Sequence, residues 1–341
     1  MSTVNTQHNR QFSWFEPARR KATEYESYTL GQQSYPDQWL DVNWPLHFDD
    51  GREPFTSDVT AVRSTSWATF RDPDKTMNRP YVARSYREQH SLEVSIHEAL
   101  EDEIGSHMNP VWRDKVLGKY YAAWPFVEYA QFMSLAYAVR EVMVDTLTYA
   151  LTFQSADKIR HQQDIVHLIF GLQNKVPGYS DDAARPAWLN SEELMPTREV
   201  IENIVASNDW AEIVLVLGLV FEPLVGELFK TEFVAQNAAK NGDAVSPMIL
   251  ANVRRDSKRH QRLVRDLSDH LTKDEQFGSS NKGTIEGWLD KWTPMCKKAA
   301  HAMQPIFEIE GIEVVSFQAS IDRVVSGQRT LLGELGLDYK G

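Results

Sequence analysis

Hydrophobic residues recur at helical spacing from about Ser66 to the C-terminal end of the chain, whereas residues 12–60 follow neither a helical nor a strand period. Proline, glycine and capping residues divide the periodic part, which begins with a short helix capped by Ser66 and includes one turn near Trp188. The longer predicted helices cover residues 78–107, 109–153, 156–174, 210–240, 248–271, 283–303 and 316–335, and one more helix begins at Thr197. Ser155 and Asp209 are predicted to cap the helices that follow them, and Pro125 is predicted to kink the helix over residues 109–153. Segments of this length predict an all-α fold, built as a bundle of long helices.

The two ends of the chain are predicted to differ from this bundle. Residues 1–60 are interpreted as an extended arm, whose aromatic side chains must cover either the protein's own helices or another protein. Residues 61–305 are predicted to form the helical bundle, and residues 306–341 a C-terminal extension. Within the extension, alternation over residues 306–317 predicts a β-hairpin ahead of the last helix.

Charge and composition exclude several classes of protein. The 341 residues hold 36 Lys and Arg against 48 Asp and Glu, a formal net charge of -12, so we expect neither nucleic acid nor a membrane surface as a partner. The longest apolar run, residues 213–221, is shorter than the roughly 20 residues of a membrane span. Cys296 is the single cysteine, and the polar N-terminus lacks a secretory signal, so we expect a cytoplasmic protein without an internal disulfide.

Two segments share the pattern D-x-x-R-H on predicted helices. They contain Asp157, Arg160 and His161, and Asp256, Arg259 and His260. The residue three positions before each histidine shares the histidine's helix face, and a glutamate there would complete a Glu-x-x-His pair. Ferritin-like di-iron bundles carry that pair twice, together with one glutamate from each of two other helices. In this sequence the two positions hold Lys158 and Ser257 instead.

Candidates for the other two ligands lie on the preceding helices, because Glu128 and Glu222 each occur in an apolar stretch. The complete set of ligand positions is Glu128, Lys158, His161, Glu222, Ser257 and His260. Lys158 brings a positive charge to the place where two cations would sit, so we expect no di-iron centre in this chain. Both histidines are then interpreted as core residues and Lys158 as the counter-charge of the glutamates, with an inter-helix hydrogen-bond lattice formed by Asp157, Arg160, Asp256 and Arg259.

At these residues the sequence resembles the β (small) subunit of the oxygenase component of bacterial multicomponent di-iron monooxygenases, the family of soluble methane, toluene, phenol, propane and alkene monooxygenases. In that family the α subunit carries two D-E-x-R-H motifs and the iron, and the β subunit is a homologous bundle that has lost the site. Residues 72–74 (DPD) ahead of Tyr81 and residues 285–292 (IEGWLDKW) are also similar to stretches of such β chains. The aromatic arm fits as well, because these β subunits lay an N-terminal arm across α.

The resemblance implies a ferritin-like (ribonucleotide-reductase-like) bundle, and a non-catalytic subunit with no metal or cofactor of its own. It implies a large α subunit with a di-iron centre as the partner, in an (αβ)2 or (αβγ)2 assembly on which a reductase and a small regulatory protein dock. Such a complex uses NADH and O2 to oxygenate a small hydrocarbon, by alkene epoxidation or by hydroxylation of an aromatic compound or an alkane.

Two other classes of protein remain open at this point. A divergent ferritin-like metalloenzyme would place Glu128, His161, Glu222 and His260 around one metal if Lys158 were displaced. In an unrelated all-α binding protein, the paired D-x-x-R-H pattern would be a coincidence. Motifs of nucleotide-binding proteins, zinc proteases and serine hydrolases are absent from the sequence. The predicted helix over residues 248–271 has a basic face. We interpret its side chains as partners in salt bridges to acidic helices, with docking of an acidic partner protein as the alternative. The face consists of Arg254, Arg255, Lys258, Arg259, Arg262 and Arg265.

Overall fold

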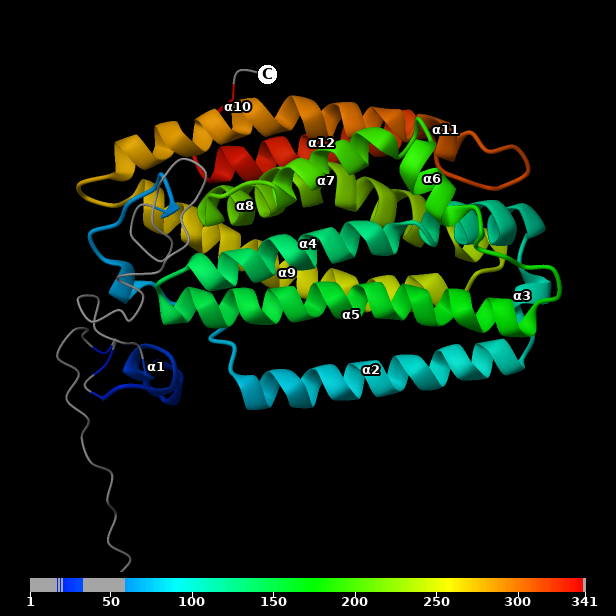
Figure 1. The fold of residues 1–341 in the computed structure, drawn as a ribbon, viewed down its shortest axis with the longest axis horizontal. Coiled ribbons are helices and arrows are strands. Elements are labelled where there is room, and N and C mark those ends of the chain that lie inside the picture. The colour runs from blue at the N-terminus through cyan, green and yellow to red at the C-terminus, as the bar shows by residue number, and fades with distance from the viewer. Residues whose placement is uncertain (1–16, 18, 20, 33–58, 340–341) are drawn as a thin grey trace, which may run out of the picture.

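The computed structural model describes residues 17, 19, 21–32 and 59–339, and no β-strand occurs among them. Its long helices run roughly side by side (Figure 1). They are α2 (Asn78–Glu101), α4 (Trp124–Glu141), α5 (Asp145–Lys175), α9 (Val245–Thr272), α10 (Gly278–Ala302) and α12 (Phe317–Glu334), together with the consecutive segments α8 (Trp210–Val216), η6 (Leu217–Gly226) and η7 (Leu228–Ala235). The all-α prediction is confirmed.

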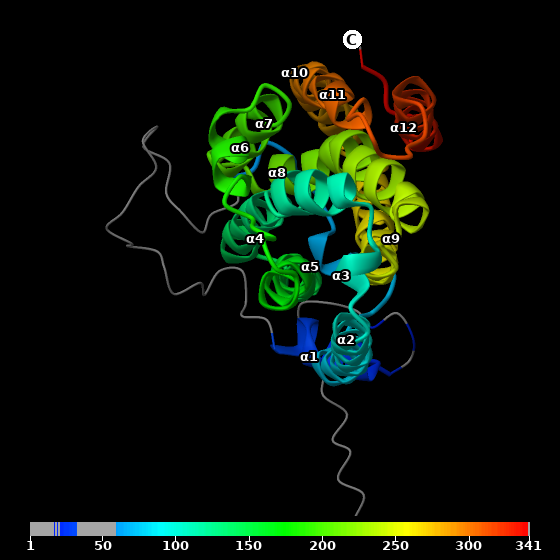
Figure 2. The same cartoon turned by 90° about the vertical axis from the view of Figure 1, so that its right-hand side faces the viewer.

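These helices are arranged in layers (Figure 2). Helices α4 and α5 pack against each other along their length, α9 packs on α5, and α2 covers the edge formed by α5 and α9. On the opposite side, α10 and α12 pack on η6, which is π-helical like η7. Shorter helices complete the sides and ends: α3 (Ile104–His107), the π-helical η5 (Trp112–Tyr121), α6 (Ala184–Asn190), α7 (Met195–Val205), the 3₁₀ turn η8 (Ala239–Asn241) and α11 (Gln304–Phe307).

One predicted helix boundary is wrong, and it concerns the helices that carry the candidate site. The chain breaks between Val142 and Val144, not at Ser155, which is a buried residue inside α5. Both valines adopt extended backbone angles, which suit β-branched residues, and the Thr148 hydroxyl bonds both of their carbonyls. Pro125 lies in the first turn of α4, where its missing N–H is tolerated, and the helical run is interrupted just before it, at residues 122 and 123 between η5 and α4.

The predicted β-hairpin at residues 306–317 is also wrong. The chain leaves α11, turns at a glycine with positive φ, and enters α12 without forming a strand. Asparagine side chains pair with this backbone in place of a second strand. Asn241 bonds both the N–H and the carbonyl of Glu313, and Asn237 Oδ1 accepts a hydrogen bond from the Val315 N–H. The last predicted helix, by contrast, is confirmed as α12.

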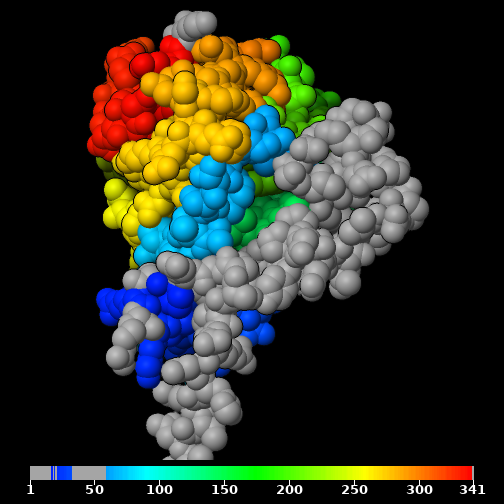
Figure 3. Space-filling model, turned by 90° about the vertical axis from the view of Figure 1, so that its left-hand side faces the viewer, coloured from blue at the N-terminus to red at the C-terminus, as the bar shows by residue number. Residues whose placement is uncertain are grey.

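Residues 59–77, which include the 3₁₀ turn η4 (Trp67–Thr69), lie against the end of the bundle where α9 and α10 meet (Figure 3). The Arg63 N–H donates to Asn281 Oδ1 at 2.9 Å, and the Thr65 N–H donates to Asp274 Oδ2 at 2.7 Å.

Part of the predicted arm is described, as α1 (Glu24–Tyr28) and the 3₁₀ turn η1 (Leu30–Gln32). The helix α1 begins at a capping box formed by Thr23 and Glu26. The rest of the arm prediction lies outside the described residues. Among the helices that the structure describes, none is long and apolar enough to cross a membrane.

Candidate functional site

The six predicted ligand positions come from four helical segments that face one another. Glu128 lies on α4, Lys158 and His161 on α5, Glu222 on η6, and Ser257 and His260 on α9. Because Lys158 and His161 are three residues apart, both side chains point from α5 into the bundle, where they are almost fully buried. The structure brings Glu128, Lys158, His161 and Glu222 together and adds Lys230 from η7, which the sequence analysis missed.

Two carboxylates and two ammonium groups alternate at the centre of this site. Lys158 Nζ lies 2.6 Å from Glu222 Oε1 and 3.4 Å from Glu128 Oε2. Lys230 Nζ lies 2.8 Å from Glu222 Oε2 and 3.1 Å from Glu128 Oε1. We refer to Glu128, Lys158, Glu222 and Lys230 as the four-charge cluster. Its formal charges cancel, and the predicted pairing of Lys158 with both glutamates is confirmed.

The ion pairs of the four-charge cluster lie largely in the protein interior, where an unpaired charge is costly. Glu128 is fully buried, Lys158 is 1% exposed, and the Glu222 side chain is 21% exposed. Burial by itself raises a carboxyl pKa, but the neighbouring ammonium groups outweigh it, holding the pKa of Glu128 well below its ordinary value and lowering the pKa of Glu222 to about 2. The carboxylates in turn raise the pKa of Lys230 against the effect of burial. Removing one member would therefore leave an unpaired buried charge, which is strongly destabilising.

Beside the four-charge cluster, the two D-x-x-R-H segments are paired crosswise between α5 and α9. Asp256 Oδ2 lies 3.1 Å from His161 Nε2. Asp157 Oδ2 lies 2.8 Å from His260 Nε2, so the aspartate of each segment binds the histidine of the other. The arginine of each segment contacts both aspartates. The predicted inter-helix lattice is confirmed, and we refer to it as the crossed lattice: Asp157, Arg160, His161, Asp256, Arg259 and His260.

The two histidines of the crossed lattice differ in their electrostatic surroundings. Burial lowers the pKa of both imidazoles because it disfavours the charged form. At His161, the carboxylates of Asp256 and Glu128 outweigh burial, and the pKa is raised. At His260, burial outweighs the Asp157 carboxylate, and the pKa is lowered. The surroundings of His161 thus favour the charged imidazole more than those of His260 do.

Lys230 and Gly226 complete the site on η6 and η7. The signal that could have revealed Lys230 is its position directly after the core residues Leu228 and Phe229, because a lysine in such surroundings requires an anionic partner. Gly226 leaves room for the Glu222 carboxylate, since a Cβ atom at residue 226 would lie 2.3 Å from Glu222 Oε2.

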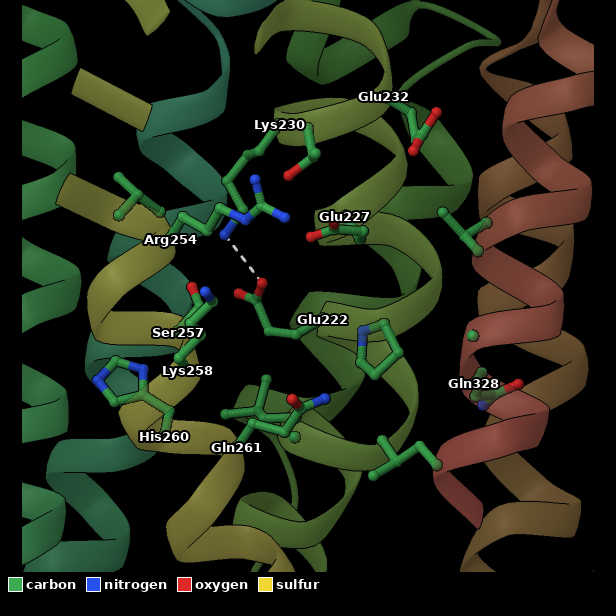
Figure 4. Close-up of a pocket in the computed structure, with 18 of the residues that line it drawn as sticks. Glu222, Glu227, Lys230, Glu232, Arg254, Ser257, Lys258, His260, Gln261 and Gln328 are labelled. Atoms are coloured by element: carbon green, nitrogen blue, oxygen red, sulfur yellow. Dashed lines mark hydrogen bonds and ion pairs between the residues drawn. The ribbon is translucent and has the colours of Figure 1, made fainter. Parts of the chain in front are cut away.

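A groove of about 350 Å³ adjoins the four-charge cluster (Figure 4). It lies between η6, η7, α9 and α12, and Lys158, Glu222 and Lys230 line it together with Ser257. Ser257, the second substituted ligand position, therefore lines the groove and is not a member of the four-charge cluster. Arg254 and Lys258, from the predicted basic face, also line the groove, whereas Arg262 pairs with a carboxylate, as the salt-bridge interpretation expects.

This donor set does not fit a metal centre. Within the described part of the chain, no group of three or more His, Cys, Asp or Glu side chains is arranged to hold a metal ion. The two central carboxylates, Glu128 and Glu222, are each paired with both Lys158 and Lys230. A metal cation would have to displace two positive charges that already satisfy these oxygens, so the geometry supports a structural ion-pair network.

Sequence comparison finds relatives along almost the entire chain. A family model described as methane/phenol/alkene hydroxylase matches residues 44–275. The small subunit of the hydroxylase component of propane 2-monooxygenase from Rhodococcus jostii (strain RHA1) is 30% identical over 331 residues, which cover 97% of this chain and 90% of the relative. The beta chain of methane monooxygenase component A from Methylococcus capsulatus (strain ATCC 33009 / NCIMB 11132 / Bath) is 28% identical over 83% of this chain and 75% of its own length.

Solved structures share the fold. A chain of phenol hydroxylase from Pseudomonas sp. OX1 aligns with a TM-score of 0.79 at 17% identity, covering 97% of this chain and 99% of that one. A chain of toluene 4-monooxygenase with bound toluene aligns with a TM-score of 0.73 at 22% identity, covering 84% and 95%. The predicted ferritin-like bundle is confirmed.

Proposed function

The chain belongs to the methane/phenol/alkene hydroxylase family, and from this premise we propose that it is the non-catalytic small (β) subunit of a multicomponent monooxygenase hydroxylase. Its relatives are named as the small subunit of a hydroxylase component or as the beta chain of a monooxygenase component, and the first match covers 97% of this chain. The role is structural: the chain contributes a stable helical bundle and a docking surface to an oxidoreductase complex.

The observation that carries this proposal is the four-charge cluster. At one of the two positions where a di-iron bundle has the glutamate of a Glu-x-x-His pair, this chain has Lys158, and a second ammonium group, that of Lys230, lies 2.8 Å from Glu222. The alternative of a mononuclear metalloenzyme is disfavoured for the same reason, because two ammonium groups would have to leave the carboxylates that they neutralise.

The reaction belongs, in this proposal, to a larger α subunit that holds the di-iron centre. The two chains would assemble as (αβ)2 or (αβγ)2, with the reductase and the small regulatory protein docking on the complex in the cytoplasm. The substrate would be a small hydrocarbon. The relatives are named for propane, methane, toluene and phenol, which supports the class but does not select one member.

The proposal is tested by co-expressing the chain with the large hydroxylase subunit of the same host. We expect the two chains to copurify in equal amounts, and NADH-dependent oxidation of a small hydrocarbon, with reductase and regulatory protein present, to require both. A large subunit that is fully active alone and does not retain this chain would refute the proposed role.

A further inference from the structure

Two neighbouring helices present an unusual outer surface. Helices α4 and α5 lie together on one side of the bundle, the side toward the viewer in Figure 1 and toward the left in Figure 2. Five large apolar side chains on these helices are between 39% and 60% exposed: Phe126, Tyr129, Met133, Val166 and Phe170. On α4 they are spaced by three and four residues, and on α5 by four, so on each helix they form a stripe. We refer to these five residues as the α4–α5 face.

The α4–α5 face lacks exposed charge over most of its length. From residue 124 to residue 139, the only charged side chain is Glu128, which is fully buried. From residue 146 to residue 174, there are four: Asp157, Lys158 and Asp164 are buried, and the Arg160 side chain is 11% exposed within the crossed lattice. In a chain with 25% charged residues, two adjacent helices thus turn their charges inward and leave their outer side without them.

Other surfaces of the bundle do not share this character. Helix α2 also exposes apolar residues, including Val82 and Val94, but exposed charged residues such as Arg79, Arg87 and Glu93 lie among them. Single apolar residues among charges are ordinary for a protein surface, whereas a contiguous uncharged patch marks an interaction site. This distinguishes the α4–α5 face from the remaining described surface of the long helices.

We infer that the α4–α5 face is where the large subunit of the hydroxylase docks. This inference rests on the proposed function, which requires a permanent partner. Permanent interfaces are large and apolar, and charged residues are depleted at their cores while aromatic residues and methionine are enriched. Two helices side by side offer an area on the order of 800 Å², which is about what one partner contributes to a standard interface.

The face continues onto the neighbouring helices. Phe126 stacks on Trp188 of α6 with 5.7 Å between ring centroids, and Leu189 and Met195 are exposed on α6 and α7 beside it. Figure 2 shows α6 and α7 on the same side of the molecule as α4. The partner would therefore cover the α4–α5 face from α5 across α4 to the beginning of α7.

A matched pair of substitutions tests the inference. Val166→Glu places a charge in the α4–α5 face, and Val94→Glu places the same charge on α2, at a valine of similar exposure. With the co-expressed large subunit, we expect Val166→Glu to weaken pairing about tenfold to a hundredfold, because the carboxylate must be desolvated, while Val94→Glu pairs as the unmodified chain does. Both variants should melt like the unmodified chain when isolated, because both side chains are on the surface.

Each other outcome has a defined meaning. If Val166→Glu and Phe170→Glu both pair with unchanged affinity while the unmodified chain also pairs, the docking face is wrong and the proposed function stands. If the unmodified chain does not pair with the large subunit at all, the proposed function fails first. If the isolated chain is a dimer that Val166→Glu dissociates, and the pair with the large subunit is unaffected, the face joins two copies of this chain and the inference is overturned.

Discussion

The inward and outward sides of α5 differ in a way that is the reverse of an ordinary surface helix. Its inward side carries Asp157, Lys158 and Asp164 among the core residues, and its outward side carries Val166 and Phe170. A surface helix of a globular protein usually buries apolar residues and exposes charged ones. On α5 the charge of Lys158 is matched by two glutamates, and Asp157 and Arg160 are matched within the crossed lattice, while burial raises the pKa of the Asp164 carboxyl. The apolar residues on the outside are exposed.

The difference separates what stabilises this chain from what joins it to another. Charges inside a bundle are costly unless each is paired, so the inward side of α5 determines how α4, α5, η6 and α9 fit together. Apolar residues on the outside contribute little to the folding of the isolated chain. Changes on the two sides should therefore have separable effects, on unfolding in one case and on pairing in the other.

The largest effect is expected from Lys158→Met. This substitution leaves Glu128 and Glu222 with a single ammonium group between them, and should lower the free energy of unfolding by about 3–5 kcal/mol, measured by urea denaturation. Lys258→Met is the matched control, because Lys258 is an exposed lysine on the rim of the same groove. An equal and small change in both variants would mean that the four-charge cluster does not stabilise the bundle.

Acid should unfold the chain through the same groups. In the folded state the pKa of Glu222 is lowered from 4.5 to about 2, and that of Asp157 from 3.8 to about 2. A lowered folded-state pKa contributes stability that is present above the unfolded-state pKa and is lost as the pH falls. The free energy of unfolding should therefore decrease by about 3 kcal/mol for Glu222 alone between about pH 5 and pH 2. Urea denaturation across this range that gives constant stability would contradict the pairing.

A smaller effect is expected from Gly226→Ala. Alanine is favoured over glycine in a helix by about 1 kcal/mol, but here its Cβ would lie 2.3 Å from Glu222 Oε2. We expect a net loss of about 1–2 kcal/mol as the carboxylate is pushed from the lysines. Gly327→Ala is the control, because a Cβ on that helical residue meets nothing within 4 Å and should stabilise α12 slightly. The account predicts opposite signs for the two substitutions.

The smallest effect concerns the histidines. His161 should titrate above its ordinary pKa of 6.5 and His260 below it, since carboxylates dominate around the first and burial around the second. Histidine-ring NMR, assigned with His161→Gln and His260→Gln, measures both. The raised pKa of His161 stabilises the fold at low pH and loses this contribution as the pH rises, whereas the lowered pKa of His260 has the opposite sign. Two identical titration curves would argue against the asymmetry.

Those parts of the site that depend on residue spacing along one helix could be predicted from the sequence. Residues three apart share a face, so the spacing of the D-x-x-R-H pattern is enough to place it and Lys158 in the interior of the bundle. Lys230 could not be placed in this way, because it follows no motif, and its role depends on η7 meeting Glu128 of α4 in space. The segment predicted as a hairpin depends on Asn237 and Asn241, which bond its backbone from 78 and 72 residues away along the chain, and no local pattern encodes such distant partners.

The most direct test of the central claim is the metal content of the isolated chain, measured by elemental analysis after growth with added iron and again after incubation with ferrous iron and washing. The account predicts no stoichiometric metal in either sample, because Lys158 and Lys230 occupy the carboxylates, and it predicts iron in the complex with the large subunit. One metal ion per isolated chain that is lost in His161→Ala would contradict the account and make this chain a metalloprotein in its own right.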